Sequence, residues 1–152
     1  MRDIIFKGKR KDKGEWVEGY LFDDGIVDSK RMFIGSLVIT EHKGLGEDVW
    51  DIGHAFYEVL PETVGQYTGL TDKKDKKIFE GDIVRADNYV FSIKYGKCGG
   101  TPNADNYGYM GFYLEAAGDG TKLHSRYGLR NDICYFTDIE IIGNIWDNSV
   151  ML

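Results

Sequence analysis

The sequence predicts a mainly β fold with little helix, built from hairpins, for a chain of 152 residues. Three observations support this prediction. The chain holds 20 glycines but only 2 prolines, a composition typical of strands joined by tight turns. Aromatic residues make up 14% of it, and such residues are enriched in strands. No segment keeps the period of an amphipathic helix over three turns, although a short helix could form at residues 129–135 or near the C-terminus.

Length and hydrophobic content indicate one folded domain. With 42% hydrophobic residues, a chain of this size can bury a core without disulfides or metals. We therefore expect a single domain over residues 1–152. Within it, residues 1–62 would form hairpins and an excursion loop, and residues 63–152 would form the C-terminal part.

The sequence also indicates a cytoplasmic protein. Arg2 and Asp3 are followed by only three apolar residues, which is unlike a signal peptide. No apolar run approaches the ~20 residues that a membrane span needs. Cys98 and Cys134 are isolated, so they form neither a disulfide framework nor a zinc knuckle, as expected of thiols in a reducing cytosol.

The first third of the chain is expected to form hairpins. A turn is expected at residues 11–14, where Gly14 can adopt a positive φ. On the strand after it, Trp16, Tyr20 and Phe22 would share one face with Glu18. A second turn is expected at residues 23–25, followed by strands at residues 26–28 and 32–40.

The clearest β pattern lies in the second half of the chain. Residues 78–95 read as two strands around a tight turn at residues 86–88. Further strands are expected at 64–67 after a turn at 61–63, at 109–116, and within 134–146.

Three segments rich in glycine or polar residues are expected to be loops or turns. Residues 41–56 have weak periodicity and three glycines, which favours a long loop or excursion. Residues 96–108 form a polar, glycine-rich stretch, and residues 118–120 a short turn.

Two pairs of carboxylates are the sharpest candidates for chemistry. Glu80 and Asp82 are two residues apart, as are Asp138 and Glu140. On a strand, such pairs share one face at about 6–7 Å and could bind a metal or transfer protons. The structural reading is favoured for both pairs. In the first, Gly81 would permit a sharp bend or bulge and Asp82 would cap the turn; the second has the spacing of a wet sheet face.

The basic run at residues 73–77 is a second candidate site. Lys73 and Lys74 begin it, and lysines at a hairpin tip can contact phosphates. The run also contains Asp75 and follows Asp72, and it has no arginine. A solvated tip that discourages edge pairing is the more common role of such lysines.

No pattern defines a catalytic residue, a metal site or a cofactor. The glycine-rich stretches do not fit a phosphate-binding motif. His42 and His54 could hold an ion with nearby acids, but an exposed polar loop is favoured, and Ser125 directly follows His124 without a catalytic arrangement. The net charge of −6 and the pI near 5.0 argue against binding nucleic acid.

The motifs of the chain resemble those of the YopX family. The stretch QYTGL at residues 66–70, followed by Asp72, Lys73 and the run IFEGDIV at residues 78–84, is similar to the family's central signature. The closing IEIIGNIWDN, residues 139–148, and the opening residues also resemble the family. Two details depart from it. Lys74 and Asp75 stand where Asn-Gly is usual, which disfavours a type I′ turn, and Ser149 and Val150 replace a Pro-Glu.

The resemblance implies a small, β-rich protein encoded by a phage or prophage and working in the bacterial cytoplasm. It implies an SH3-like barrel portion and allows a homo-oligomer, and it brings no catalytic residues. We expect an accessory protein that binds a host or phage protein through aromatic-rich β surfaces and is not an enzyme.

Two alternatives remain open. One is the sequestration of a small, nucleotide-derived ligand by residues 96–108 and 73–77 of an oligomer, as a counter-defence function. The other is a metal-dependent enzyme acting on nucleic acid through Glu80 and Asp82, or through Asp138 and Glu140.

Overall fold

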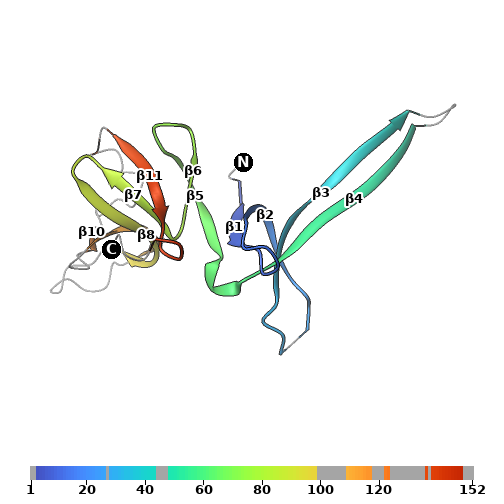
Figure 1. Cartoon of the computed structure of the whole chain (residues 1–152), viewed down its shortest axis with the longest axis horizontal. Helices are drawn as coiled ribbons and strands as arrows, with labels where there is room; N and C mark the ends of the chain where they lie inside the picture. Colours follow the sequence, from blue (N-terminus) through green and yellow to red (C-terminus); the bar gives the residue numbers. More distant parts are fainter. Residues whose placement is uncertain are drawn as a thin grey trace. The chain divides into compact units, whose positions relative to one another are not determined.

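The computed structural model describes residues 3–26, 28–43, 48–98, 109–117, 122–123, 136 and 138–148 (Figure 1). The described chain is mainly β, as predicted, and its strand pairs are antiparallel. It divides into two compact units, one spanning Ile4–Gln66 and the other formed mainly by the chain from Tyr67 onward. None of the described residues forms a helix of the length and apolarity that a membrane crossing requires.

The N-terminal unit is a sheet of hairpins. Its strands are β1 (Phe6–Lys9), β2 (Trp16–Asp23), β3 (Met32–Lys43), β4 (Asp48–Val59) and the start of β5 (Gly65–Thr71). Their hydrogen-bonding order is β4-β3-β2-β1-β5, which makes β4 an edge strand. A short 3-10 helix, η1 (Pro61–Thr63), provides the expected turn before β5.

The predicted turns of the first hairpins are confirmed. Between β1 and β2, Gly14 has φ +70° and its N–H donates to the Arg10 carbonyl at 2.9 Å. After β2, Gly25 has φ +67° and donates to a carboxylate oxygen of Asp23 at 2.9 Å. A positive φ is a conformation that glycine adopts at little cost, which explains why the hairpin turns fall at these residues.

The strand predicted at residues 26–28 was wrong for Ile26 and Asp28, which lie outside any strand; Val27 is outside the described residues. The Ile26 N–H donates to an Asp24 carboxylate oxygen at 3.1 Å, and the Ile26 carbonyl accepts from the Ser29 N–H at 3.0 Å. These backbone groups are therefore used within a local turn rather than in a sheet ladder.

The loop predicted at residues 41–56 was also wrong. β3 continues to Lys43 and β4 begins at Asp48, and the two strands run side by side (Figure 1). Their register is unbroken from the Met32–Val59 pair to the Lys43–Asp48 pair. Pairing across the hairpin satisfies the backbone groups, so strand structure forms here despite weak local propensity. Residues 44–47 of the predicted loop lie outside the described residues.

The second unit contains a five-stranded sheet. Its strands are β7 (Asp82–Ala86), β8 (Tyr89–Cys98), β9 (Tyr109–Ala116), β10 (Lys122–Leu123) and β11 (Ile139–Asn144), in the order β10-β9-β8-β7-β11. The later residues of β5 pair with β6 (Lys77–Phe79). The predicted turn between β7 and β8 is confirmed, with Asp87 at φ +52°.

The glycine-rich loop predicted at residues 96–108 needs one correction. Residues 96–98 belong to β8 and pair with residues 109–111 of β9. The rest of that loop lies outside the described residues, as do the predicted turn at 118–120 and the helix considered at 129–135.

The core of the second unit is an apolar cluster contributed by five strands. Its buried members are Ile78, Val84, Ala86, Phe91, Ile93, Leu114 and Ile139. Along β8, Phe91 and Ile93 are buried, whereas Tyr89 and Tyr95 at either end of the same alternating row are exposed. The alternation seen in the sequence therefore identifies the core-facing row. The single domain, the boundary after residue 62 and the SH3-like barrel portion stay predictions.

Candidate functional site

Four of the six predicted site residues lie together at the tip of the β5–β6 hairpin. The Lys73 ammonium lies 3.1 Å from an Asp138 carboxylate oxygen and 3.0 Å from a Glu140 carboxylate oxygen. Lys74 also bonds to Glu140. Hydrogen bonds from Lys74 and Lys73 lower the pKa of Glu140 to about 2, and hydrogen bonds to Glu140 and Asp138 raise the pKa of Lys73.

This arrangement couples the basic run to the second carboxylate pair. The ion pairs are partly exposed and therefore screened by solvent. A backbone hydrogen bond of 2.9 Å from the Lys73 N–H to the Ile139 carbonyl holds β11 beside the tip. Because the carboxylates already neutralise Lys73 and Lys74, the tip offers little net positive charge to a phosphate. Their role as a binding site stays a prediction.

Asp72 is the residue at this tip that the sequence reading passed over as part of a solvated run. It is only 5% exposed. One carboxylate oxygen accepts from the N–H groups of Lys74 and Lys76 at 2.8 and 3.0 Å, and the other accepts from Ile141 at 3.3 Å. Burial raises the pKa of Asp72, but these N–H donors outweigh it and the net pKa is lowered. An aspartate at the start of a polar turn is the signal that could have identified it.

The other predicted pair, Glu80 and Asp82, is not on one face of a strand. Glu80 lies in the turn between β6 and β7, and Asp82 begins β7. Asp82 is 1% exposed and its carboxylate accepts from the Phe79 N–H at 2.8 Å. Gly81 between them has φ +83°. The predicted bend at Gly81 and turn cap at Asp82 are confirmed, and any binding role of this pair stays a prediction.

No group of three metal-ligating side chains is found within the described part of the chain. The side chains of His42 and His54, which the sequence reading considered as ligands, lie outside it.

The N-terminal unit exposes aromatic side chains of β2 that the sequence placed on one strand face but not among the candidate site residues. Tyr20 is 58% exposed and Phe22 44% exposed, and both lie on β2. In the sheet register, Phe22 faces Phe33, Tyr20 faces Gly35, and Gly35 faces Phe56. Because paired residues share a face, Tyr20, Phe22, Phe33 and Phe56 lie on one side of the sheet. We call these four residues the aromatic face. The Phe22 and Phe56 rings meet edge-on at 5.0 Å.

Charged residues border the aromatic face at the end of β4. Glu58, which is paired with Phe33 across the sheet, bonds Lys11 at 2.8 Å and Arg31 at 3.1 Å. Arg31 also lies over the Phe33 ring, 5.1 Å from its centroid. Hydrogen bonds from Arg31 and Lys11 lower the pKa of Glu58 to about 2.

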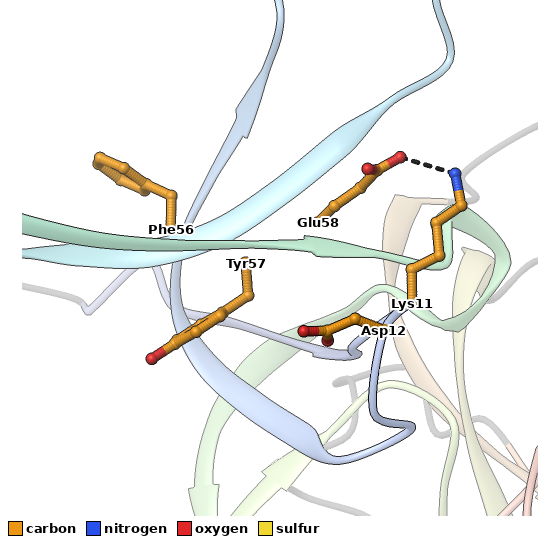
Figure 2. Close-up of a pocket in the computed structure, with 5 residues that line it drawn as sticks. All are labelled: Lys11, Asp12, Phe56, Tyr57 and Glu58. Carbon is orange, nitrogen blue, oxygen red and sulfur yellow. Dashed lines mark hydrogen bonds and ion pairs between the residues drawn. The ribbon is translucent and has the colours of Figure 1, made fainter.

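A pocket of about 280 Å³ opens beside these residues (Figure 2). It is lined by Lys11, Asp12, Phe56, Tyr57 and Glu58. Figure 2 shows Phe56 and Glu58 on one side of the β4 ribbon and Tyr57 on the other, with Lys11 reaching Glu58. Three consecutive residues of a strand can line one pocket only where it opens along the edge of that strand, because neighbouring side chains point to opposite faces.

The opposite side of β4 carries a second charged group. The Arg10 guanidinium stacks on the Tyr57 ring at 3.9 Å from the ring centroid. Arg10 bonds Asp12 at 2.7 Å and Glu15 at 3.4 Å. The side-chain hydrogen bond between Arg10 and Asp12 raises the pKa of Arg10 and lowers the pKa of Asp12.

Fold and surface together define a two-unit antiparallel β protein with a buried core in one unit and an exposed aromatic face in the other. The comparison with family models places it more narrowly. The family model described as YopX protein matches residues 5–152, and the chain belongs to the YopX family. The resemblance inferred from the sequence motifs is thereby confirmed. No curated protein matches the chain.

Proposed function

We propose that this protein acts by binding a protein partner through the aromatic face, and not by catalysis. The observation that carries the proposal is the exposure of large aromatic side chains on one side of a regular sheet. Tyr20 and Phe22 are 58% and 44% exposed, and Phe56 lies beside Phe22. Aromatic residues are enriched in the cores of protein interfaces, and clustered exposed apolar groups mark interaction sites.

The polar border of the aromatic face supports the same proposal. Glu58, Lys11 and Arg31 form an ion-pair group at its margin. An apolar centre with a charged rim is the usual anatomy of a protein–protein interface. Family membership and the sequence motifs support a role as a phage or prophage accessory protein in the cytoplasm of a bacterial host.

Self-association is part of the proposal, because the β3–β4 hairpin extends beyond the residues of β3 that pair with β2. Within the part of the chain that the structure describes, β2 pairs with β3 over Met32–Gly35, whereas β3 and β4 pair as far as Lys43 and Asp48. A two-stranded ribbon is marginally stable by itself in water. A strand from a second copy would lie beside the ribbon and stabilise it, and native mass spectrometry of the purified chain would report such a homo-oligomer.

The other two hypotheses receive less support. Lys73 is already bound by Asp138 and Glu140, which lowers the attraction of the basic run for a nucleotide phosphate. Asp82 is buried and bonds the Phe79 N–H, so using it as a metal ligand would cost that turn its cap.

The proposal is tested by site-specific photo-crosslinking in host cells. A photoreactive phenylalanine analogue is placed at Tyr20, and at Tyr89 as the matched control, since Tyr89 is an exposed aromatic of the other unit, 63% exposed. We expect a crosslinked protein from the Tyr20 position only. The captured protein, once purified, should bind the wild-type chain and bind Tyr20→Asp at least tenfold more weakly. Equal crosslinking at both positions, or unchanged binding by Tyr20→Asp, would contradict the proposal.

A further inference from the structure

The outer edge of β4 already accepts a second strand at one point. Arg10 forms an antiparallel bridge with Val59. The Lys11 N–H donates to the Glu58 carbonyl, and the Leu60 N–H donates to the Lys9 carbonyl, both at 2.9 Å. β4 is the last strand of its sheet, so this bridge lies on the edge away from β3.

Beyond this bridge, the residues that follow β1 turn away from the outer edge of β4. The turn from Lys11 to Gly14 leads back to β2, closed by a 2.9 Å bond from the Gly14 N–H to Arg10. The pocket of about 280 Å³ lies where the chain turns away, along the Phe56–Glu58 stretch of β4. Its volume falls just below the ~300–1,000 Å³ of pockets that enclose a drug-sized ligand. It fits one or two side chains of a segment lying on the strand edge better than a whole nucleotide.

The two sides of this edge present different charged side chains to the pocket. On the side of Glu58, Lys11 is the cation that lines the pocket; it shares the Glu58 carboxylate with Arg31, which also interacts with Asp24. On the side of Tyr57, Arg10 meets the carboxylates of Asp12 and Glu15, which leaves one negative charge in excess. Successive side chains of an added strand would point to these two sides in turn.

We propose that an extended segment of the protein partner adds to the sheet, antiparallel to β4, along the edge beside Lys11. Its acidic side chain lies against Lys11 on the Glu58 side, and its neighbouring basic side chain lies against Asp12 on the Tyr57 side. This inference rests on the proposed function, because it names the kind of segment through which the partner binds. Strand addition of this kind draws affinity from main-chain hydrogen bonds and specificity from alternating side-chain sites.

The geometry also fixes which backbone groups of the segment face β4. The Glu58 carbonyl points to the outer edge of β4, where it accepts from the Lys11 N–H. In an antiparallel ladder, every second residue of a strand directs its backbone N–H and C=O groups to the same edge, and the side chains of these residues lie on one side of the sheet. A segment residue that exchanges hydrogen bonds with this edge therefore has its side chain on the Glu58 side. The N–H of the acidic residue faces β4, and the N–H of the basic residue faces away.

The test uses the full chain and short fluorescent peptides blocked at both ends, with binding followed by fluorescence anisotropy. The peptides share a β-prone threonine and valine frame and differ in two central residues: Glu-Lys, Glu-Glu, Lys-Lys or Thr-Thr. We expect Glu-Lys to bind most tightly, by about two- to fivefold over each of the others, as for exposed charge pairs. Methylating the Glu amide nitrogen should weaken binding at least tenfold, and methylating the Lys amide nitrogen should leave it within about twofold.

Charge reversal provides the matched control. Lys11→Glu should come to prefer the Lys-Lys peptide, and Asp12→Lys the Glu-Glu peptide, an exchange of preference that a partly unfolded variant would not produce. Equal binding of all four peptides, no binding of any, or equal effects of the two methylations would overturn the inference. Failure here with specific crosslinking at Tyr20 leaves partner binding through the aromatic face intact. The expected peptide binding without specific crosslinking at Tyr20 would support strand addition and contradict partner binding through the aromatic face.

Discussion

Alternating strands in the two units place their aromatic residues differently between core and surface: β8 buries Phe91 between two exposed tyrosines, whereas β2 exposes both Tyr20 and Phe22. In the unit that begins at Tyr67, Phe91 of β8 is 1% exposed and packs within the apolar cluster. In the unit spanning Ile4–Gln66, Tyr20 and Phe22 of β2 remain exposed although they too lie on a paired strand. An alternating pattern therefore predicts a strand in both cases, but burial depends on whether other strands cover that face. The exposed pair on β2 belongs to the aromatic face on which the proposed function rests.

The largest effect is expected from the core of the second unit. Phe91→Ala removes a fully buried ring and should lower the free energy of unfolding by about 3–5 kcal/mol. Urea denaturation followed by circular dichroism measures this change. Tyr89→Ala is the matched control, two residues away on the same row and 63% exposed, with an expected change of about 1 kcal/mol or less. Similar losses for both variants would mean that burial does not separate these two rings.

A slightly smaller effect is expected at the turn that begins β7. Gly81 has φ +83°, and a Cβ there would overlap the Trp146 ring. Gly81→Ala combines backbone strain with a clash and should cost about 3 kcal/mol. Gly69 has φ +87° but faces open space, so Gly69→Ala should cost only about 1 kcal/mol from the backbone. Thermal melts of both variants check the difference; equal costs would show that Trp146 moves aside freely.

Local pattern was enough to predict the strands whose side chains alternate between core and solvent. The β7–β8 hairpin and the Gly81 bend were predicted because a few neighbouring residues determine them: a turn at Asp87, and a glycine beside a capping Asp82. The β3–β4 hairpin was not predicted at its full length, because that length comes from pairing between strands rather than from local propensity.

The charged candidates illustrate the same limit. Lys73 and Asp138 are 65 residues apart in sequence, yet their side chains bond at 3.2 Å. Spacing in the chain identified each group but could not show that one neutralises the other. Likewise, the aromatic face joins residues of three strands through their register, which no single stretch of sequence contains.

Asp72 offers a third, smaller effect in the second unit. Asp72→Ala leaves three partly buried N–H groups without their acceptor and should cost about 2 kcal/mol. Asp75→Asn is the control, because it removes a charge from the same turn without touching those donors, and we expect a change within about 0.5 kcal/mol. Chemical denaturation at neutral pH distinguishes them. A loss from Asp75→Asn as large as that from Asp72→Ala would indicate that charge, not hydrogen bonding, holds the tip.

The smallest effect is a pH dependence that each unit should show separately. The pKa values of Glu58 in the N-terminal unit and Glu140 in the other are lowered from 4.5 to about 2. A carboxylate whose pKa is lowered by folding stabilises the native state above its unfolded pKa and loses that contribution as the pH falls through its folded pKa. The free energy of unfolding should therefore decline as the pH falls from about 4.5 to 2. Near neutral pH, Glu58 and Glu140 should make it neither rise nor fall with pH.

Substitution separates the two contributions. Glu140→Gln should flatten the acid decline of the second unit, and Glu58→Gln that of the N-terminal unit, when amide exchange is followed by NMR across this pH range. Each variant should be slightly less stable than the wild type at pH 7, and the difference should shrink as the pH falls toward 2, where the wild-type carboxyl is about half protonated. Since both groups are partly exposed, salt should reduce the difference at pH 7. An acid decline unchanged by Glu140→Gln would mean that its ion pairs with Lys73 and Lys74 contribute nothing to folding.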